Sequence, residues 1–428
     1  MVNLLATSEL LSLCKKDYDI TKPLYQKMQD YYNGNGLTDA LMNYKMITSR
    51  SNQKIPKNMI QKFILEEVAF CLANGIGYTS HSGDKNIIED IRLNITKSWS
   101  EKHEDELLKQ ALTFSKSYEL IYLDAFANFK AMICNPLNSY VFQDDFGNVQ
   151  LFIRFFQKKF DIITIYADVY EGNLITHYIV DGTSFTQIGV VDTNIFSKTP
   201  VVPCEIGSVY ETVFANIKGQ QDGYEITQSN FINEISDNRN AILVTAGGTI
   251  EEGKEDDLLT KAIMEVPVGG DAKWLLKEYP DNFIQNALTT LDENMFSIAN
   301  HINHNEKSPS NQSSLAQQNK LMGLSSKCSK NINSVQDCIK MRLQFLFEFL
   351  QIKQSKTYSY LDVDIVMTVS IPSDDYQVSQ MLSQNPKIPT EIGFGLYSFI
   401  PDVDKAMKLY EEEKKANSIG NVLLNGGV

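Results

Sequence analysis

Arginine is scarce in this chain. Only five of its 39 basic side chains are Arg, and 53 acidic side chains outnumber the basic ones, which gives a net charge of −14. Proteins that hold nucleic acid tightly normally carry a basic excess, and they use the guanidinium fork of Arg to bind phosphate. The composition therefore argues against a dedicated nucleic-acid binder, and we expect any contact with DNA to be weak.

Paired cysteines and long apolar runs are also missing. The six cysteines include no C-x-x-C pair, so we expect buried free thiols in a reducing compartment. No apolar run reaches the roughly 18 residues of a membrane span, and the N-terminus does not have the pattern of a signal peptide. With 43% apolar residues among 428, we expect a globular intracellular protein of two or three domains.

Sequence motifs of catalysis are absent or incomplete. There is no G-x-S-x-G element and no dinucleotide fingerprint. Gly248–Glu255 matches the phosphate-binding pattern G-x-x-x-x-G-K-[ST] except at its last position, where Glu255 replaces the hydroxyl residue that binds magnesium. Carboxylates that would repel a triphosphate crowd this stretch, namely Glu251, Glu252, Glu255, Asp256 and Asp257. We predict an exposed acidic turn.

The histidine patterns do not predict a metal site. His301 and His304 have a spacing that can ligate a metal on one helix face, but no cysteine lies nearby and Glu306 is the only carboxylate close in sequence. We therefore predict polar histidines at a fraying helix end. His103–Leu107 fails the zinc-protease pattern because Leu107 stands where the second His is required. No catalytic residue, metal or cofactor is predicted.

The first third of the chain is predicted to be mainly helical, and the region after it β-rich. Within residues 1–135, segments 56–70 and 86–117 have helical periodicity. A turn signal at Asp144–Asn148 opens a series of runs rich in β-branched and aromatic residues, which predicts an antiparallel meander. These runs are Val149–Phe156, Phe160–Val169, Leu174–Val180 and Phe185–Val191. A later alternating run, Val363–Ile371, is predicted to be a strand of a sheet beside the helical body.

The centre of the chain is its most informative part. A helix with a thin apolar stripe (Tyr224, Phe231 and Ile235) leads into a β-type insert, and a second amphipathic helix opens at Asp281. A polar stretch, 303–314, then precedes a helix of about 36 residues, roughly 54 Å long at 1.5 Å per residue. Enzymes rarely need two helices that carry a small module away from the body. Proteins that line a conduit or project a docking element do need them.

Short stretches along most of the chain resemble, in the same order, motifs of the portal proteins of tailed bacteriophages, the head-to-tail connectors. The stretches are Tyr31–Gly34, Asn58–Gly75, Asn135–Pro136, Val141–Asp144, Pro200–Pro203, Ala241–Val244, Ser313–Ala316, Pro389–Glu391, Ile400–Asp404 and Glu411–Glu413. Ser314 stands where the family has Gly. The collinear order of these stretches carries the resemblance.

The resemblance implies an α+β portal-type fold with a helical and β wing, a two-helix stem, a small α/β clip, a long wing helix and a short helical crown. The implied parts are a wing at 1–221, with a helical N-terminal part and an antiparallel β region, a first stem helix at 222–241, a clip at 242–280, a second stem helix at 281–304, a tunnel loop at 305–314, the long wing helix and a strand at 315–385, and a short crown or C-terminal tail at 386–428.

The function that the resemblance implies is a ring at one capsid vertex, the channel for DNA packaging and ejection. The implied partners are further copies in a dodecamer, a terminase packaging motor, a head-tail adaptor, capsid and scaffold proteins, and double-stranded DNA without sequence specificity, with no membrane. Assembly would occur in the bacterial host cytoplasm, the product would lie in the virion, and the protein would perform no bond chemistry. A negative wall suits such a channel, because DNA carries one charge per roughly 1.7 Å and must slide.

Two sets of residues would carry these contacts. The tunnel loop lacks apolar anchors, Pro309 prevents the long helix from extending backwards, and Glu306 partly offsets the charge of Lys307. The loop residues expected to face DNA are His304, Asn305, Glu306, Lys307, Ser308, Pro309, Ser310 and Asn311. The clip residues expected to dock partners, including the motor and the adaptor, are Glu251, Glu252, Asp256, Asp257 and Trp274.

Two other functions stay open at this point. One is a nucleotide-hydrolysing enzyme built on residues 248–254, which a nucleotide-binding assay would detect. The other is a structural capsid or baseplate-like component that does not contact DNA. Particle imaging separates the last alternative from a portal, because only a portal occupies one unique vertex with an open axial channel.

Overall fold

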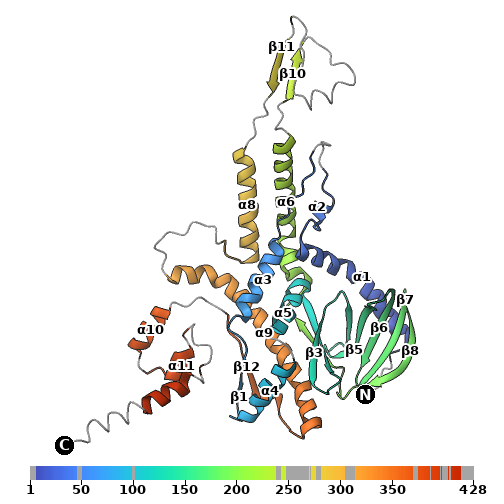
Figure 1. Cartoon of the computed structure of the whole chain (residues 1–428), viewed down its shortest axis with the longest axis vertical. Helices are drawn as coiled ribbons and strands as arrows, with labels where there is room; N and C mark the ends of the chain where they lie inside the picture. The colour runs from blue at the N-terminus through green and yellow to red at the C-terminus, as the bar shows by residue number, and fades with distance from the viewer. Residues whose placement is uncertain are drawn as a thin grey trace, which may run out of the picture.

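The fold comes from a computed structural model. It describes residues 6–45, 51–98, 102–237, 242–246, 269, 271–275, 281–303, 314–369, 375–385, 387–395, 397, 403 and 406–415. Helices and strands are mixed along the chain, which confirms the predicted α+β class. Figure 1 shows a central body, a sheet region on one side and an arm of two helices that projects from the body.

Long helices build the body. Its helices are α1 (Ser8–Asn33), α2 (Asp39–Met42), α3 (Met59–Leu72), α4 (Lys85–Ser98), α5 (Lys102–Phe114), α6 (Val213–Asp237), α8 (Asp281–Ala299) and α9 (Ser314–Gln354). The predicted helix at 56–70 is confirmed as α3, and Asn58 caps it by accepting a hydrogen bond from the Gln61 amide. The predicted long helix is confirmed as α9, whose apolar residues form one side of the main core.

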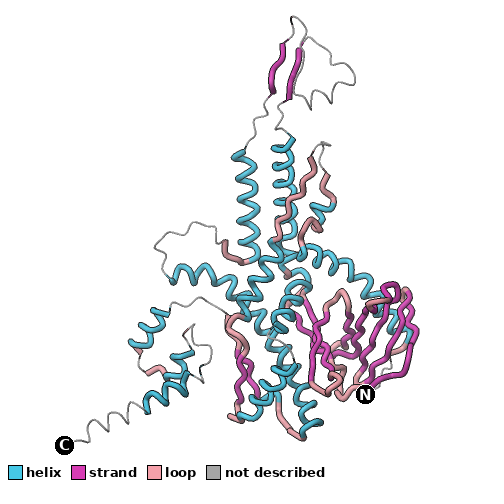
Figure 2. The backbone as a smooth tube through the Cα atoms, in the orientation of Figure 1, coloured by secondary structure: helices cyan, strands magenta, loops and turns pink. Residues whose placement is uncertain are grey.

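The β region consists of two sheets. The larger one is the meander β4 (Ser139–Gln143), β5 (Val149–Lys158), β6 (Asp161–Glu171), β7 (Leu174–Asp181) and β8 (Ser184–Thr193), with antiparallel neighbours throughout. This confirms the predicted meander, including its turn at Asp144–Asn148. The smaller sheet has the order β3-β2-β9, with β2 at Lys116–Leu123, β3 at Phe129–Cys134 and β9 at Val201–Glu205. Figure 2 shows both sheets gathered on the same side of the body.

The structure corrects the prediction for the end of the helical region. Segment 86–117 is two helices, α4 and α5, and the chain then enters strands β2 and β3 within the part predicted to be mainly helical. Residues of β2 from Ser117 to Ile121 are all buried, because one face meets the helices and the other meets the larger sheet. A strand buried on both faces has no alternating pattern, so periodicity alone cannot separate it from a buried helix.

The late strand is shorter than predicted. Only Val363–Val366 forms a strand, β12, and it pairs with β1 (Gly77–Ser80) in a sheet of two antiparallel strands beside the body. Residues 367–369 are described but lie outside the strand, and Ile371 lies outside the described residues. Val363 has no exposed surface, whereas Val366 is half exposed. Strand β12 therefore packs on the core only at its first residue. The C-terminal part holds α10 (Asp375–Gln384) and α11 (Thr390–Gly395).

All six cysteines are free and buried, as predicted. Burial raises the pKa of the Cys134 thiol to about 12. A thiol with such a pKa is almost entirely protonated at neutral pH and reacts poorly. Cys134 therefore acts as a small core residue.

Candidate functional site

Two of the helices form an arm that projects from the body. α6 and α8 run side by side out of the body and carry a pair of antiparallel strands, β10 (Ile242–Ala246) and β11 (Asp271–Leu275), at their far end (Figure 1). Both helices reach into the body. α6 begins at Val213 instead of at residue 222, and α8 ends at Ala299 instead of at residue 304, where Asn300 leaves the helix with a φ of 58°.

From Gln221 onwards, the face that α6 turns into the body is polar. Gln221, Glu225, Ser229 and Asn233 are all buried. Their spacing of four residues places them on one side of the helix. A helix normally buries an apolar stripe, so the acceptors on this face need donors from another part of the chain.

An extended segment, residues 51–57, supplies these donors. The amide of Gln53 donates to Asn233 Oδ1 at 2.7 Å, that of Ile55 to Ser229 Oγ at 3.0 Å, and that of Lys57 to Glu225 Oε1 at 2.9 Å. Alternate amides of the segment thus meet successive acceptors of α6. The spacing matches because four helical residues rise about 6 Å, and two extended residues advance about 6.6 Å.

The same ladder also binds Thr38 and Tyr44. Asn233 Nδ2 also donates to the carbonyl of Gln53 and to the Tyr44 hydroxyl, and the Thr38 hydroxyl donates to Glu225 Oε2 at 2.5 Å. Burial raises the pKa of Glu225, although the Thr38 hydroxyl and the Lys57 amide work in the opposite direction. We call residues 51–57 the strap. It fixes α6 through main-chain hydrogen bonds.

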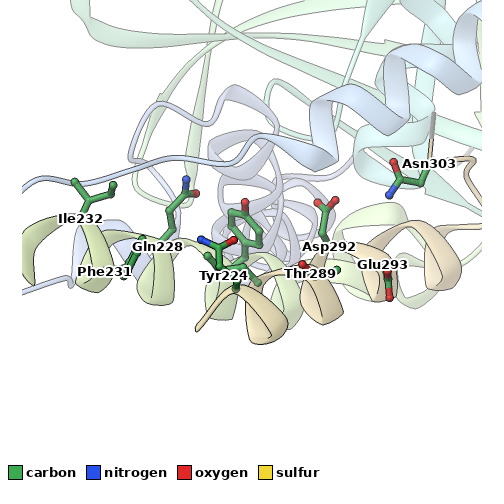
Figure 3. Close-up of a pocket in the computed structure, with 10 residues that line it drawn as sticks. Tyr224, Gln228, Phe231, Ile232, Thr289, Asp292, Glu293 and Asn303 are labelled. Atoms are coloured by element: carbon green, nitrogen blue, oxygen red, sulfur yellow. The ribbon is translucent and has the colours of Figure 1, made fainter. Parts of the chain in front are cut away.

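A groove lies between the arm helices. Its volume is about 440 Å³, and its lining residues are Tyr224, Gln228, Phe231, Ile232, Gln285, Leu288, Thr289, Asp292, Glu293 and Asn303. Figure 3 shows Tyr224 on α6 and Asp292 on α8 projecting to the same side of the two helices. There Lys57 Nζ lies 2.5 Å from Asp292 Oδ1 and 4.1 Å from the ring centroid of Tyr224, which joins the strap to both helices.

Buried charges hold the base of the arm. Glu67 of α3 has no exposed side-chain surface, and it accepts from Lys327 Nζ at 2.5 Å, from Asn331 Nδ2 at 3.0 Å and from His301 Nε2 at 3.2 Å. Burial by itself would raise the pKa of Glu67, but the His301 hydrogen bond and the Lys327 ammonium lower it below its ordinary value. One carboxylate thus joins α3, the residue stretch after α8, and α9.

A second buried ion cluster joins α9 to the smaller sheet. Arg342 donates to both oxygens of Glu119, at 2.9 and 2.6 Å, and to Glu104 at 2.9 Å, while His103 Nε2 lies 2.5 Å from Glu119. Burial opposes ionisation of Glu119, but the charge of Arg342 and the His103 hydrogen bond outweigh it and lower its pKa to about 2. The incomplete zinc-protease pattern at His103 is therefore part of an ion cluster in the core.

Most of the predicted site residues lie outside the described residues. This holds for the whole expected tunnel-loop set, His304 to Asn311, and for Glu251, Glu252, Asp256 and Asp257 in the expected clip. The phosphate-loop pattern Gly248–Glu255 lies there as well. Trp274 is on β11 and pairs in register with Leu243 of β10. Their predicted roles stay predictions.

His301 differs from its prediction. It is buried and bonded to two carboxylates of α3, so it is not a polar residue at a fraying end. Sequence analysis missed Glu66 and Glu67 because they lie more than 230 positions away. Within the part of the chain that the structure describes, there is no cluster of metal-ligating side chains. No helix of that part is long and apolar enough to cross a membrane.

An α+β body, crossed by one long helix and extended by an arm of two helices with a β pair at its end, is the architecture of a portal-type protein. The chain belongs to the family described as "Phage portal protein, SPP1 Gp6-like", whose model matches residues 11–419.

Two solved structures of gene transfer agent (GTA) particles are similar to this chain. "Virion of native gene transfer agent (GTA) particle" matches with a TM-score of 0.42 and 8% identity, over 77% of this chain and 85% of the other. "Neck of empty GTA particle computed with C6 symmetry" matches with a TM-score of 0.44 and 9% identity, over 81% and 88%. The comparison with curated proteins finds no match.

Proposed function

We propose that this chain is one subunit of a closed ring at a unique vertex of a phage capsid, the channel through which DNA is packaged and ejected. The observation that carries the proposal is the projecting two-helix arm in a member of the portal family. α6 and α8 are the stem helices of this proposal, the module between them is the clip, and residues 305–314 are the tunnel loop.

The arm leaves apolar surface that one subunit does not cover. Ile226 and Ile235 on α6, and Phe283 and Ile298 on α8, are all at least 40% exposed. Such residues on a projecting pair of helices are suited to bury against a neighbouring copy. A contact between two different faces of identical subunits closes into a ring when its rotation divides a full turn.

Native mass spectrometry and end-on electron micrographs test ring formation. The wild-type chain should form closed cyclic oligomers, and Phe283→Glu should shift it towards monomers, because Phe283 is 73% exposed on the arm. Phe146→Glu is the matched control, since Phe146 is 90% exposed on the β4–β5 turn and should leave the rings intact. Wild-type protein that stays monomeric across a wide range of concentration and salt would refute the ring.

The proposed clip docks the packaging motor and the head-tail adaptor through its acidic residues and Trp274. Replacing Glu251, Glu252, Asp256 and Asp257 by Ala should keep the rings but weaken or alter partner docking. Replacing Glu411, Glu412 and Glu413, which are exposed on the C-terminal segment, is the control for loss of charge elsewhere. Unchanged binding of motor and adaptor by the clip variant would contradict the assignment.

The proposed tunnel loop faces DNA through polar side chains and the single cation Lys307. Weak contacts of this kind would let DNA slide, because each phosphate contact adds to affinity and to salt dependence. A shortened loop should leave the rings intact and impair packaging or retention of the genome. If a loop-shortened portal packages and retains a full genome normally, residues 305–314 are only a linker.

The chain itself is proposed to perform no bond chemistry, and hydrolysis of ATP would belong to the motor. A nucleotide-binding assay on the purified ring tests this point directly, because residues 248–254 retain part of a phosphate-loop pattern. Saturable binding of a nucleoside triphosphate would overturn it.

A further inference from the structure

The edge strand β8 has an irregular end. In the larger sheet, β8 has a single neighbouring strand, β7 (Figure 1). His177 of β7 lies opposite Ile188 of β8. Two residues earlier on β7, Ile175 lies opposite Asp192, which is four residues further along β8. Strand β8 is therefore bulged in this interval, where Gly189 takes a φ of 71°. A bulge interrupts backbone pairing, so side-chain contacts matter more for the end of the strand.

A row of alternating charges crosses this part of the sheet. Arg154 of β5 is paired in register with Asp168 of β6, and Asp168 is paired with His177 of β7. Arg154 Nη1 lies 3.5 Å from Asp168 Oδ2. His177 Nδ1 lies 2.7 Å from Asp168 Oδ1, and His177 Nε2 lies 3.1 Å from Asp192 Oδ2. One imidazole thus joins β6 to the end of β8 beyond the bulge.

A neutral imidazole has only one N–H group, so only the imidazolium can donate to both carboxylates. We propose that His177 is a pH-sensitive link that holds the end of β8 to the sheet, and that it releases Asp192 when it loses its proton. Every copy of the chain carries this link, so the proposal does not rest on ring formation.

The two carboxylates differ in exposure, which decides the bond that breaks. The side chain of Asp168 is 13% exposed and that of Asp192 is 62% exposed. The bond to Asp168 is also the shorter one, so the neutral ring keeps its proton on Nδ1. Nε2 then has a lone pair facing Asp192, and two acceptors cannot bond to each other. The exposed carboxylate of Asp192 turns towards water at little cost.

The carboxylates also set the pH range of the link. Burial by itself would lower the pKa of His177, but its hydrogen bonds to Asp168 and Asp192 and the charges of both carboxylates raise it above the ordinary 6.5. Arg154, the other cation of the row, contacts Asp168 from the neighbouring strand. A raised pKa means that the link is fully present below about pH 6.5 and is lost as the pH rises through the pKa of the folded chain.

Hydrogen exchange of the full-length protein, measured by mass spectrometry on peptides that cover residues 186–194, tests the proposal. The Asn194 amide donates to the Asn173 carbonyl at 2.8 Å and reports the end of β8. From about pH 5.5 to about pH 8.5, exchange corrected for its intrinsic rate should rise about two- to fivefold, the factor that corresponds to an exposed ion pair. The Phe155 amide of β5, which donates to the Asn138 carbonyl at 2.8 Å, is the internal reference and should not change.

Two substitutions separate a titrating link from ordinary packing. His177→Gln removes the titrating group. In Asp192→Asn the side-chain amide can either accept from Nε2 or donate to it, so it bonds to both forms of the ring. Both variants should make exchange at the end of β8 independent of pH. His81→Gln is the matched control, because His81 Nε2 lies 3.1 Å from Asp364 on the β1–β12 sheet, and it should keep the wild-type profile.

Two results would overturn the proposal. One is corrected exchange at the end of β8 that does not rise with pH in the wild type. The other is a rise of the wild-type size in His177→Gln or in Asp192→Asn, because the pH dependence would then come from another group.

Discussion

The arm helix α6 and the core helix α9 bury opposite kinds of side chain. α9 buries an apolar stripe that includes Cys328, Ile332, Val335, Ile339, Leu343, Leu346 and Leu350, with Arg342 among them. α6 buries a polar stripe of four acceptors. The strap supplies main-chain donors to three of them, and the Ile60 amide of α3 donates to the fourth, Gln221. Hydrophobic burial is non-directional, whereas hydrogen bonds require a fixed register.

The difference shows two ways to hold a long helix. The apolar stripe gives α9 most of its stability and tolerates small shifts. The polar stripe fixes the rotation and the axial position of α6 against the strap. Each of its hydrogen bonds contributes less net free energy than a buried apolar side chain does. A helix that projects from a body needs a defined orientation, and the polar ladder supplies it.

Arg342 offers the strongest test of this comparison, because it is the charged exception within the apolar stripe. Arg342→Met should lower the free energy of unfolding by about 3–5 kcal/mol, since it leaves Glu119 buried without its main cation. Urea unfolding followed by circular dichroism measures the change. Arg92→Met is the control, since Arg92 is exposed on α4 and its loss should cost little. Equal stability of the two variants would show that the ion cluster is dispensable.

The apolar part of α9 should behave as an ordinary core. Ile339 has no exposed surface, and Ile339→Ala should cost about 2–5 kcal/mol by removing buried methyl groups and leaving a cavity. The same urea titration reports it. The exposed Ile352, near the end of the same helix, provides the control substitution Ile352→Ala. A loss below that of the control would mean that α9 is not packed as described.

Acid should weaken the ion cluster around Arg342 and Glu119 before it affects the apolar stripe of α9. The pKa of Glu119 is lowered from 4.5 to about 2, so its ionised form stabilises the fold above about pH 4.5, and this contribution is lost as the pH falls towards 2. The shift corresponds to about 3 kcal/mol. Glu119→Gln should therefore be less stable than wild type at neutral pH and approach it near pH 2. A difference that stays constant with pH would contradict this origin.

The α6 ladder should show the smallest loss of stability and the most local effect. Ser229→Ala leaves the Ile55 amide without its acceptor and should cost about 1–3 kcal/mol, with faster hydrogen exchange at Ile55. Ser326→Ala on an exposed position of α9 controls for the change in helix propensity. Unchanged exchange at Ile55 would mean that the strap is not held by this ladder.

Elements with a regular apolar pattern could be predicted from the sequence, and elements that depend on distant partners could not. α3, α9 and the meander β5–β8 follow directly from their periodicity. β2 did not, because a strand buried on both faces has no alternation. The arm was predicted from two helices around a β-type insert, but the start of α6 was placed nine residues too late, since residues 213–221 bury Val213, Phe214 and Ile217 in the body core.

The buried polar face of α6 had a weak signal in the sequence, which sequence analysis did not use. Gln221, Glu225, Ser229 and Asn233 recur every four residues, which is the spacing of a single helix face. Nothing in the sequence says that this face meets an extended segment about 170 positions earlier. His301 is a similar case, because its carboxylate partners lie on α3, and only the folded chain brings them together.

α1 connects two separate cores. Its first half places Leu11, Cys14 and Tyr18 on the larger sheet, and its second half places Tyr25 and Met28 in the main core. Pro23 lies between these halves and cannot donate a backbone hydrogen bond to the preceding turn. The helix is therefore least stiff between its two attachment points. α1 should therefore bend at Pro23 when force is applied to the larger sheet. The sheet would tilt about this residue before the helices at the centre of the molecule are strained.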